Sequence, residues 1–207
     1  MGIRVIATTV LCMVWLMPVI ADAPSPEVTD QLTAGCRLIV AEFKQALMGE
    51  FMRAMKEGGP STAIRVCRDK APAVAADYSE LEGWSIRRTA LRTRNPNNNP
   101  DDFERATLML LELDTLTEYT QWITDDEGNQ TFRYMSAIDM AQPCVTCHGP
   151  REAIDDSLET IINENYPEDH AVGFDAGDLR GAFSLTVSWP AGKHVADSLA
   201  KTKQTKE

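Results

Sequence analysis

The sequence is short of positive charge, of histidine and of long apolar runs. Its 20 lysine and arginine residues stand against 31 aspartate and glutamate residues, so the formal net charge is −11. An acidic surface repels phosphate groups, which argues against a sequence-independent nucleic-acid binder and against attachment to an anionic membrane surface. The one long apolar run lies at the N-terminus, and this excludes a multi-span membrane protein.

The 207 residues also show no internal repeat and no Pro-, Gly- or Ser-rich linker. Hydrophobic residues make up 43% and charged residues 25% of the chain. These proportions are typical of a globular protein with a buried core. We therefore expect a single folded domain over residues 22–207, after a short N-terminal segment.

That N-terminal segment, residues 1–21, has the pattern of a signal peptide. Arg4 precedes an apolar run over residues 5–20, and Val19 and Ala21 suit the recognition positions of signal peptidase. We predict cleavage after Ala21 and a mature protein in the periplasm, with no stable membrane insertion. The alternative is a retained membrane anchor, although the run is slightly short for a membrane span.

The spacing of apolar residues predicts an α+β domain. A long helix is expected over residues 27–57, ended by Gly58 and Gly59, and a second helix begins at Ser61 and breaks or restarts at Pro72. The remaining predicted elements are strands at 84–91, 119–124, 131–138 and 181–189, helices at 101–113, 151–164 and 192–203, and loops at 94–100 and 141–149. This order indicates a small antiparallel sheet flanked by helices.

The segment Cys144-Val145-Thr146-Cys147-His148 has the Cys-x-x-Cys-His pattern of c-type haem attachment. In this pattern the two thiols form thioether bonds with the vinyl groups of haem, and the adjacent histidine is placed to bind the iron. Such haem is assembled outside the cytoplasm, so the motif agrees with the predicted export. We therefore expect one covalently attached haem c.

Three other interpretations of the cysteine pair stay open. A redox Cys-x-x-Cys usually opens a helix directly after a strand, whereas Gln142 and Pro143 place this pair in a predicted loop. A zinc site would need two more soft ligands at close spacing, and none lies nearby in the sequence. A disulfide between Cys144 and Cys147 would also suit an exported protein.

The residues alone leave open which group, if any, binds the iron opposite His148. Cys67 lies on the apolar face of a predicted helix, and positive neighbours in the sequence favour its thiolate, the form that binds iron (Arg65, Arg68 and Lys70). The other candidates are His170, His194, Cys36 and the methionines of the mature chain, of which Met52, Met55 and Met109 fall at core-like positions.

The residues around Cys67 resemble the opening of a known family. The stretch GPSTAIRVCRDKAP, residues 59–72, is similar to the start of a family of exported single-haem c-type proteins with a PAS-like fold. The family was catalogued as a domain of unknown function, and it also forms the sensor part of some histidine kinases and chemoreceptors. The resemblance continues at Arg88-Thr89, Arg94-Asn95-Pro96, Asn98, Pro100 and Asp101, and at residues 144–149 and 177–182, and so spans residues 58–187.

The resemblance implies that His148 and Cys67 bind the iron from opposite sides. Three arginines match positions of the family motifs, and haem has two propionates that need cationic or amide partners. We therefore name Arg88, Arg94 and Arg180 as candidates for propionate contacts, with a structural or surface role as the alternative for each. Cys36 has no counterpart in the family pattern, so it is either a small buried residue or the disulfide partner of Cys67.

Such a ligand pair implies a low reduction potential, because an anionic thiolate stabilises ferric iron. We expect reduction to loosen or replace Cys67 and to open a position for CO or NO, which is the two-state behaviour of a redox or gas sensor. The alternative is a small soluble electron carrier, which keeps both ligands. Both functions need a protein partner. A peroxidase or reductase is expected least, because a chain with 3 histidines has few distal acid–base groups.

Overall fold

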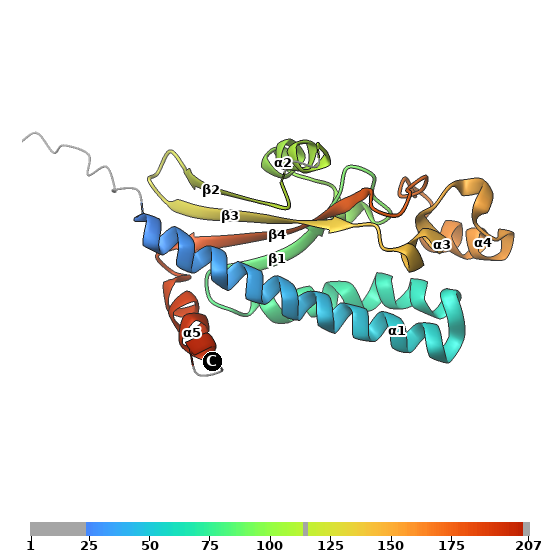
Figure 1. Cartoon of the computed structure of the whole chain (residues 1–207), viewed down its shortest axis with the longest axis horizontal. Coiled ribbons are helices and arrows are strands. Elements are labelled where there is room, and N and C mark those ends of the chain that lie inside the picture. Colours follow the sequence, from blue (N-terminus) through green and yellow to red (C-terminus); the bar gives the residue numbers. More distant parts are fainter. Residues whose placement is uncertain (1–23, 114–115, 205–207) are drawn as a thin grey trace, which may run out of the picture.

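The computed structural model describes residues 24–113 and 116–204 (Figure 1). A four-stranded antiparallel sheet lies at its centre, with the long helix α1 (Pro26–Ser79) on one face and α2 (Asp102–Glu112) on the other. This is the α+β architecture that the sequence predicts. The predicted signal peptide and its cleavage site after Ala21 lie outside the described residues.

The sheet has the strand order β1-β4-β3-β2, and every neighbouring pair is antiparallel. The strands expected over 119–124 and 131–138 are β2 and β3, which pair as a hairpin. Its turn is closed by Asp125, whose carboxylate accepts the backbone N–H groups of Glu127 and Asn129. The strands are β1 (Trp84–Thr89), β2 (Glu118–Thr124), β3 (Gln130–Asp139) and β4 (Leu179–Trp189).

The two faces of the sheet carry separate cores, because successive strand residues point to opposite sides. On β3, Phe132 and Tyr134 face α1, whereas Met135 packs with Leu108 and Leu111 of α2. The larger core joins the sheet to α1 and α5 (Lys193–Gln204) through Leu32, Cys36, Ile39, Val40, Phe43, Trp84, Ile86, Phe132, Tyr134, Phe183, Leu185, Val187, Val195 and Ala196. The site described below lies at one end of this core.

Helix α1 is a hairpin of two antiparallel arms (Figure 1). The first arm, residues 26–57, and the return arm, residues 60–79, meet at Gly58 and Gly59, whose backbone angles are not helical. Gly59 has φ of 66°, a left-handed conformation that glycine adopts at least cost. The predicted helix end at this pair is therefore confirmed as a turn.

The predicted helix break at Pro72 is wrong. The backbone stays helical through Pro72 to Ser79. A proline removes one helical hydrogen bond, which costs about 3 kcal/mol in a helix interior. The return arm offsets this cost by packing Val74 and Tyr78 against the larger core, and Tyr78 also meets the Phe43 ring edge-on at 5.9 Å between centroids.

Two predicted loops contain short helices, which sequence spacing is too coarse to reveal. Residues 94–100 hold the 3-10 turn η1 (Pro96–Asn98), and residues 141–149 hold η2 (Gln142–Cys144) followed by α3 (Val145–His148). The helix expected over 151–164 is divided into η3 (Arg151–Ala153) and α4 (Asp156–Asn165). Within the two described stretches, no helix has the length and apolar character that crossing a membrane requires.

Candidate functional site

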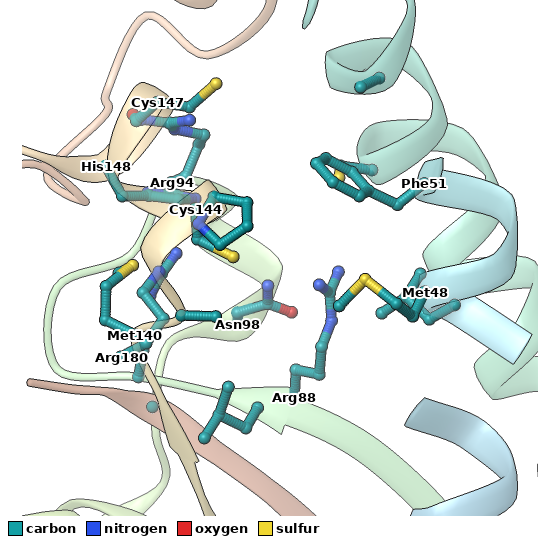
Figure 2. Close-up of a pocket in the computed structure, with 18 of the residues that line it drawn as sticks. Met48, Phe51, Arg88, Arg94, Asn98, Met140, Cys144, Cys147, His148 and Arg180 are labelled. Carbon is teal, nitrogen blue, oxygen red and sulfur yellow. The ribbon is translucent and has the colours of Figure 1, made fainter. Parts of the chain in front are cut away.

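A cavity of about 280 Å³ lies between the α1 hairpin and the segment that follows β3 (Figure 2). Its lining includes all seven residues that the sequence singled out as the candidate site, namely Cys67, Arg88, Arg94, Cys144, Cys147, His148 and Arg180. Cysteines and arginines that are far apart in the chain therefore share one site.

The cavity has two walls of different construction. One wall is η2 and α3, which carry Cys144, Cys147 and His148, and the other is the α1 hairpin, from which Met48 and Phe51 face them in Figure 2. The return arm of α1 contributes Cys67 to the lining. The sheet end between the walls supplies Arg88 and Arg180.

The motif segment is held in a tight helical turn. Pro143 lies in the first turn of η2, and the backbone N–H of Gly149 ends α3 by donating to the carbonyl of Val145 at 2.7 Å. A Cβ at Gly149 would lie 2.7 Å from the same carbonyl oxygen, so the close approach leaves no room for a side chain. The turn directs both thiols and the imidazole into one cavity.

His148 is prepared to bind a metal ion through one defined nitrogen. Its Nδ1 lies 2.7 Å from the carbonyl oxygen of Ala171. Because a carbonyl only accepts, Nδ1 carries the proton and Nε2 keeps its lone pair. Burial, followed by the charges of Arg180 and Arg94, lowers the pKa of His148 to about 2. The imidazole is therefore neutral at physiological pH, as a ligand must be.

The loop that carries Ala171 is itself fixed. The backbone N–H of Phe174 donates to the carbonyl of His148 at 3.0 Å, and that of Gly173 donates to Gly149 at 2.7 Å. Arg92 donates to the carbonyl of Val172 at 2.9 Å, and its guanidinium lies 3.5 Å from the centroid of the Phe174 ring. Arg92 was not singled out in the sequence, because only the fold brings it to the loop of residues 172–174.

Arg94 links the motif to the same loop. Its Nη2 donates to the carbonyl of Cys147 at 2.6 Å and to the Asp169 carboxylate at 2.9 Å. The Asp169 side chain is only 2% exposed. The Nε of Arg94 is buried without a hydrogen-bond partner. Arg94 therefore positions the Cys147 backbone, a role that its motif position alone did not predict. Its buried Nε–H group has no acceptor among the described residues.

Arg88 and Arg180 bring positive charge to the cavity without matching carboxylates. Arg180 donates to the carbonyl of Arg92 at 3.2 Å, and neither arginine forms a salt bridge with the described residues. Burial lowers the pKa of both, and for Arg180 the positive charges of Arg94 and Arg88 add to this and bring it to about 10. Half-buried cations without an acidic partner are costly, so this end of the cavity suits an anionic group.

The environment of Cys67 differs from the one expected. Arg65 and Arg68 are exposed, and Arg68 bonds instead to Asp69 and to Asn165 of α4. The cations that face Cys67 come from elsewhere in the fold, namely Arg88, Arg94 and Arg180. Burial outweighs them and raises the pKa of the Cys67 thiol. The prediction of a thiolate favoured by its own helix is therefore wrong, because burial is the dominant effect.

Of the other ligand candidates named by residue, none lines the cavity, namely His170, His194, Cys36, Met52, Met55 and Met109. His170 and His194 are exposed, and Met52 and Met109 are 56% and 59% exposed. Cys36 is buried in the core between α1 and the sheet. All four cysteines of the described residues are free, so the structure contains neither the Cys36–Cys67 nor the Cys144–Cys147 disulfide. No group of three or more His, Cys, Asp and Glu side chains that could hold a metal ion occurs in the described stretches.

Several lining residues were missed in the sequence. Met48 and Met140 line the cavity, although the spacing had drawn attention to Met52 and Met55 instead. Phe51 also lines the cavity, from the same arm of α1 as Met48. Asn98 and Tyr166 also belong to the lining, and Tyr166 reaches it from the end of α4.

The fold and the cavity together define a PAS-like α+β protein with a Cys-x-x-Cys-His site facing a helix cysteine. Residues 24–188 match the Tll0287-like family, and the chain belongs to this family. It is similar to a solved crystal structure, that of the cyanobacterial haem protein Tll0287, with 27% sequence identity and a TM-score of 0.55. The similarity covers 81% of this chain and 99% of the other. The comparison with curated proteins gave no match.

Proposed function

We propose that the protein is a periplasmic, redox- or gas-responsive haem module that carries one haem c attached to Cys144 and Cys147. His148 and Cys67 are its axial ligands. The observation that carries the proposal is the single cavity that gathers the Cys-x-x-Cys-His motif with Cys67. The solved family member at 27% identity is a haem protein, which supports the same cofactor here.

The residues of the cavity fit this cofactor. His148 offers a neutral imidazole with a free Nε2 lone pair. The walls are largely apolar, with Leu47, Phe51 and Phe183 in the lining, and an apolar macrocycle needs such walls. The buried Nε of Arg94 and the unpaired Arg88 are suitable donors for propionate oxygens. When bound, the haem supplies an iron centre that changes charge by one unit on reduction and can bind CO or NO.

Cys67 provides the responsive contact in this proposal. Burial disfavours its thiolate, so nearby ferric charge is needed to stabilise the deprotonated sulfur. Reduction removes one positive charge, and the buried thiol is then favoured again. Cys67 would therefore hold the return arm of α1 to the cofactor in the ferric state and release it in the ferrous state. A protein partner that distinguishes the two positions of this arm would read the signal.

Location follows from the same chemistry. We propose export and cleavage after Ala21, because covalent haem c is assembled outside the cytoplasm. Intact-mass spectrometry of the protein purified from a periplasmic extract tests this. The expected chain begins at Asp22 and carries the mass of one haem that survives denaturation. A chain that keeps residues 1–21, or one recovered from the membrane fraction, would contradict the proposed location.

Ligation is tested by low-temperature electron paramagnetic resonance of the ferric protein. Low-spin signals of a thiolate-bound haem are expected in the wild type and are lost in Cys67→Ser. Cys36→Ser is the matched control and should keep them, because Cys36 lies in the core rather than in the cavity. Unchanged signals in Cys67→Ser would refute the ligand assignment.

The responsive role is tested separately by adding CO to the ferrous protein. Rapid formation of a CO adduct, with loss of the Cys67 contact, is the expected result. A ferrous protein that keeps Cys67 and binds no CO would instead indicate the electron carrier.

A further inference from the structure

We infer that Met48 is a second iron ligand of this site, one that replaces Cys67 when the iron is reduced. The inference rests on the proposed function, since it needs a haem held by His148. It adds a residue that the sequence did not single out. It also gives the reduced iron a protein ligand in place of an open position.

Met48 lies on the wall of the cavity that faces His148. It projects from the first arm of α1 into the cavity, opposite the wall of Cys144 and His148 (Figure 2). Cys67 comes from the return arm of the same hairpin. Two sulfur-bearing side chains therefore approach the cavity from α1, whereas the histidine approaches from α3.

Core packing does not explain why a methionine stands at position 48. Its side chain is 42% exposed, and it belongs to none of the buried core clusters. Leaving that much apolar surface in water forgoes the stabilisation that burial gives. The unbranched thioether has three rotatable bonds, so its sulfur can move within the cavity without a change of backbone.

The other methionines are placed differently. Met140 lines the cavity but is 2% exposed and packs with Ala171 and Phe174, which lie on the His148 side. Met52 follows Met48 on the first arm, is 56% exposed and does not line the cavity. Among the described methionines, Met48 alone combines a place in the lining, the α1 wall and freedom to move.

The chemistry of the two sulfurs sets the direction of the exchange. A thiolate matches the extra charge of ferric iron, whereas a neutral thioether suits the softer ferrous ion. One electron from a low-potential one-electron donor reduces the iron. The bond to Cys67 breaks, its sulfur takes a proton from solvent, and a lone pair of the Met48 Sδ forms the new bond. The exchange consumes one electron and one proton.

The test is proton–carbon NMR of the ferrous holoprotein labelled at methionine methyl groups. A methionine bound to a haem lies directly over the ring, whose current shifts the methyl signal far upfield of all others. The wild type should show one such signal, Met48→Leu should lack it, and Met52→Leu should keep it. The ferric resonance spectra of both variants should equal that of the wild type.

CO titration provides a second readout. Removing a competing ligand raises the fraction of haem that is open, so Met48→Leu should bind CO about tenfold more tightly than the wild type. Met52→Leu should bind CO as the wild type does.

The outcomes separate this inference from the proposed function. A thiolate-type ferric spectrum, together with a ferrous protein that lacks the shifted methyl or keeps it in Met48→Leu, overturns the role of Met48 alone. Absence of covalent haem, or of the thiolate signal, overturns the proposed function itself. If folding of Met48→Leu is impaired, Met48→Gln gives the same comparison with a polar side chain that suits the exposed position.

Discussion

The two walls of the cavity differ in what holds their chemical groups in place. On the α3 wall, His148 is bonded to Ala171 through its ring and to Phe174 through its backbone, and Arg94 fixes the carbonyl of Cys147. On the α1 wall, the Cys67 thiol makes no hydrogen bond with the described residues, and Met48 is partly exposed. This difference supports the proposal that the α3 wall keeps its iron ligand while the α1 wall exchanges its own.

The difference has a physical basis in the two kinds of contact. Hydrogen bonds to backbone groups are directional, so they fix the orientation of the imidazole as well as its position. The return arm of α1 is held instead by apolar contacts, such as that of Ile64 with α4, and by the bond from Arg68 to Asn165. Apolar contacts are not directional, and they tolerate small displacements of a helix.

The largest expected effect comes from removing the proposed covalent attachment on the α3 wall. The double variant Cys144→Ser/Cys147→Ser should retain no haem after denaturation and extraction with acidified solvent, because both proposed thioether bonds would be lost. Mass spectrometry of the denatured chain provides the measurement. Cys36→Ser is the control and should keep its haem. Haem that survives denaturation in the double variant would mean attachment at another residue.

Loss of a single charge should also lower the unfolding free energy more on the α3 wall than on the α1 wall. Arg94→Gln leaves the buried Asp169 carboxylate without its partner, and breaking a buried ion pair costs about 3–5 kcal/mol of unfolding free energy. Urea unfolding followed by circular dichroism measures the loss. Arg65→Gln removes an exposed charge and should change stability by less than about 0.5 kcal/mol. Equal losses of unfolding free energy in the two variants would contradict this difference between the two walls.

If Cys67 and His148 bind the iron as proposed, acid should release them in a fixed order. Burial raises the pKa of the Cys67 thiol, whereas the pKa of His148 is lowered to about 2. As the pH falls, the thiolate therefore takes a proton first and the imidazole last. An acid titration of the ferric protein, followed by absorption and paramagnetic resonance, should show loss of the thiolate signal before loss of the histidine ligand. Loss of the histidine ligand before the thiolate signal would contradict the proposed difference between the two walls.

The smallest effect concerns the turn of the α1 hairpin. Gly59 has φ of 66°, so Gly59→Ala should lower the unfolding free energy by about 1 kcal/mol. Gly49 lies in the regular first arm, where an added Cβ meets nothing within 4 Å. Gly49→Ala should therefore raise the unfolding free energy by about 0.5–1 kcal/mol. Urea unfolding of both variants measures the two changes in unfolding free energy. If both variants were stabilised, the turn would not need a residue with positive φ.

Much of this site could be predicted from short stretches of sequence. The motif at Cys144–His148 and the segment around Cys67 are local patterns, and the turn at Gly58 and Gly59 is a local signal. The surroundings of Cys67 could not be predicted in this way, because its cations come from β1, from β4 and from the loop after β1 rather than from its own helix.

The same limit applies to the fold. The break expected at Pro72 fails because packing of the return arm outweighs the local preference of proline. The partner of His148 is a backbone carbonyl at Ala171, and no side-chain pattern reveals a backbone acceptor. Met48 lines the cavity because the fold turns its face of the first arm of α1 toward the cavity, which the spacing of residues does not reveal.

Hydrogen–deuterium exchange of the ferric and ferrous holoprotein tests the central claim most directly. If the α1 wall exchanges its ligand and the α3 wall does not, reduction should speed amide exchange in the return arm, residues 60–79. Amides of residues 145–149 and 169–174 should keep their rates. Faster exchange in the α3 wall on reduction, with the return arm unchanged, would contradict the account.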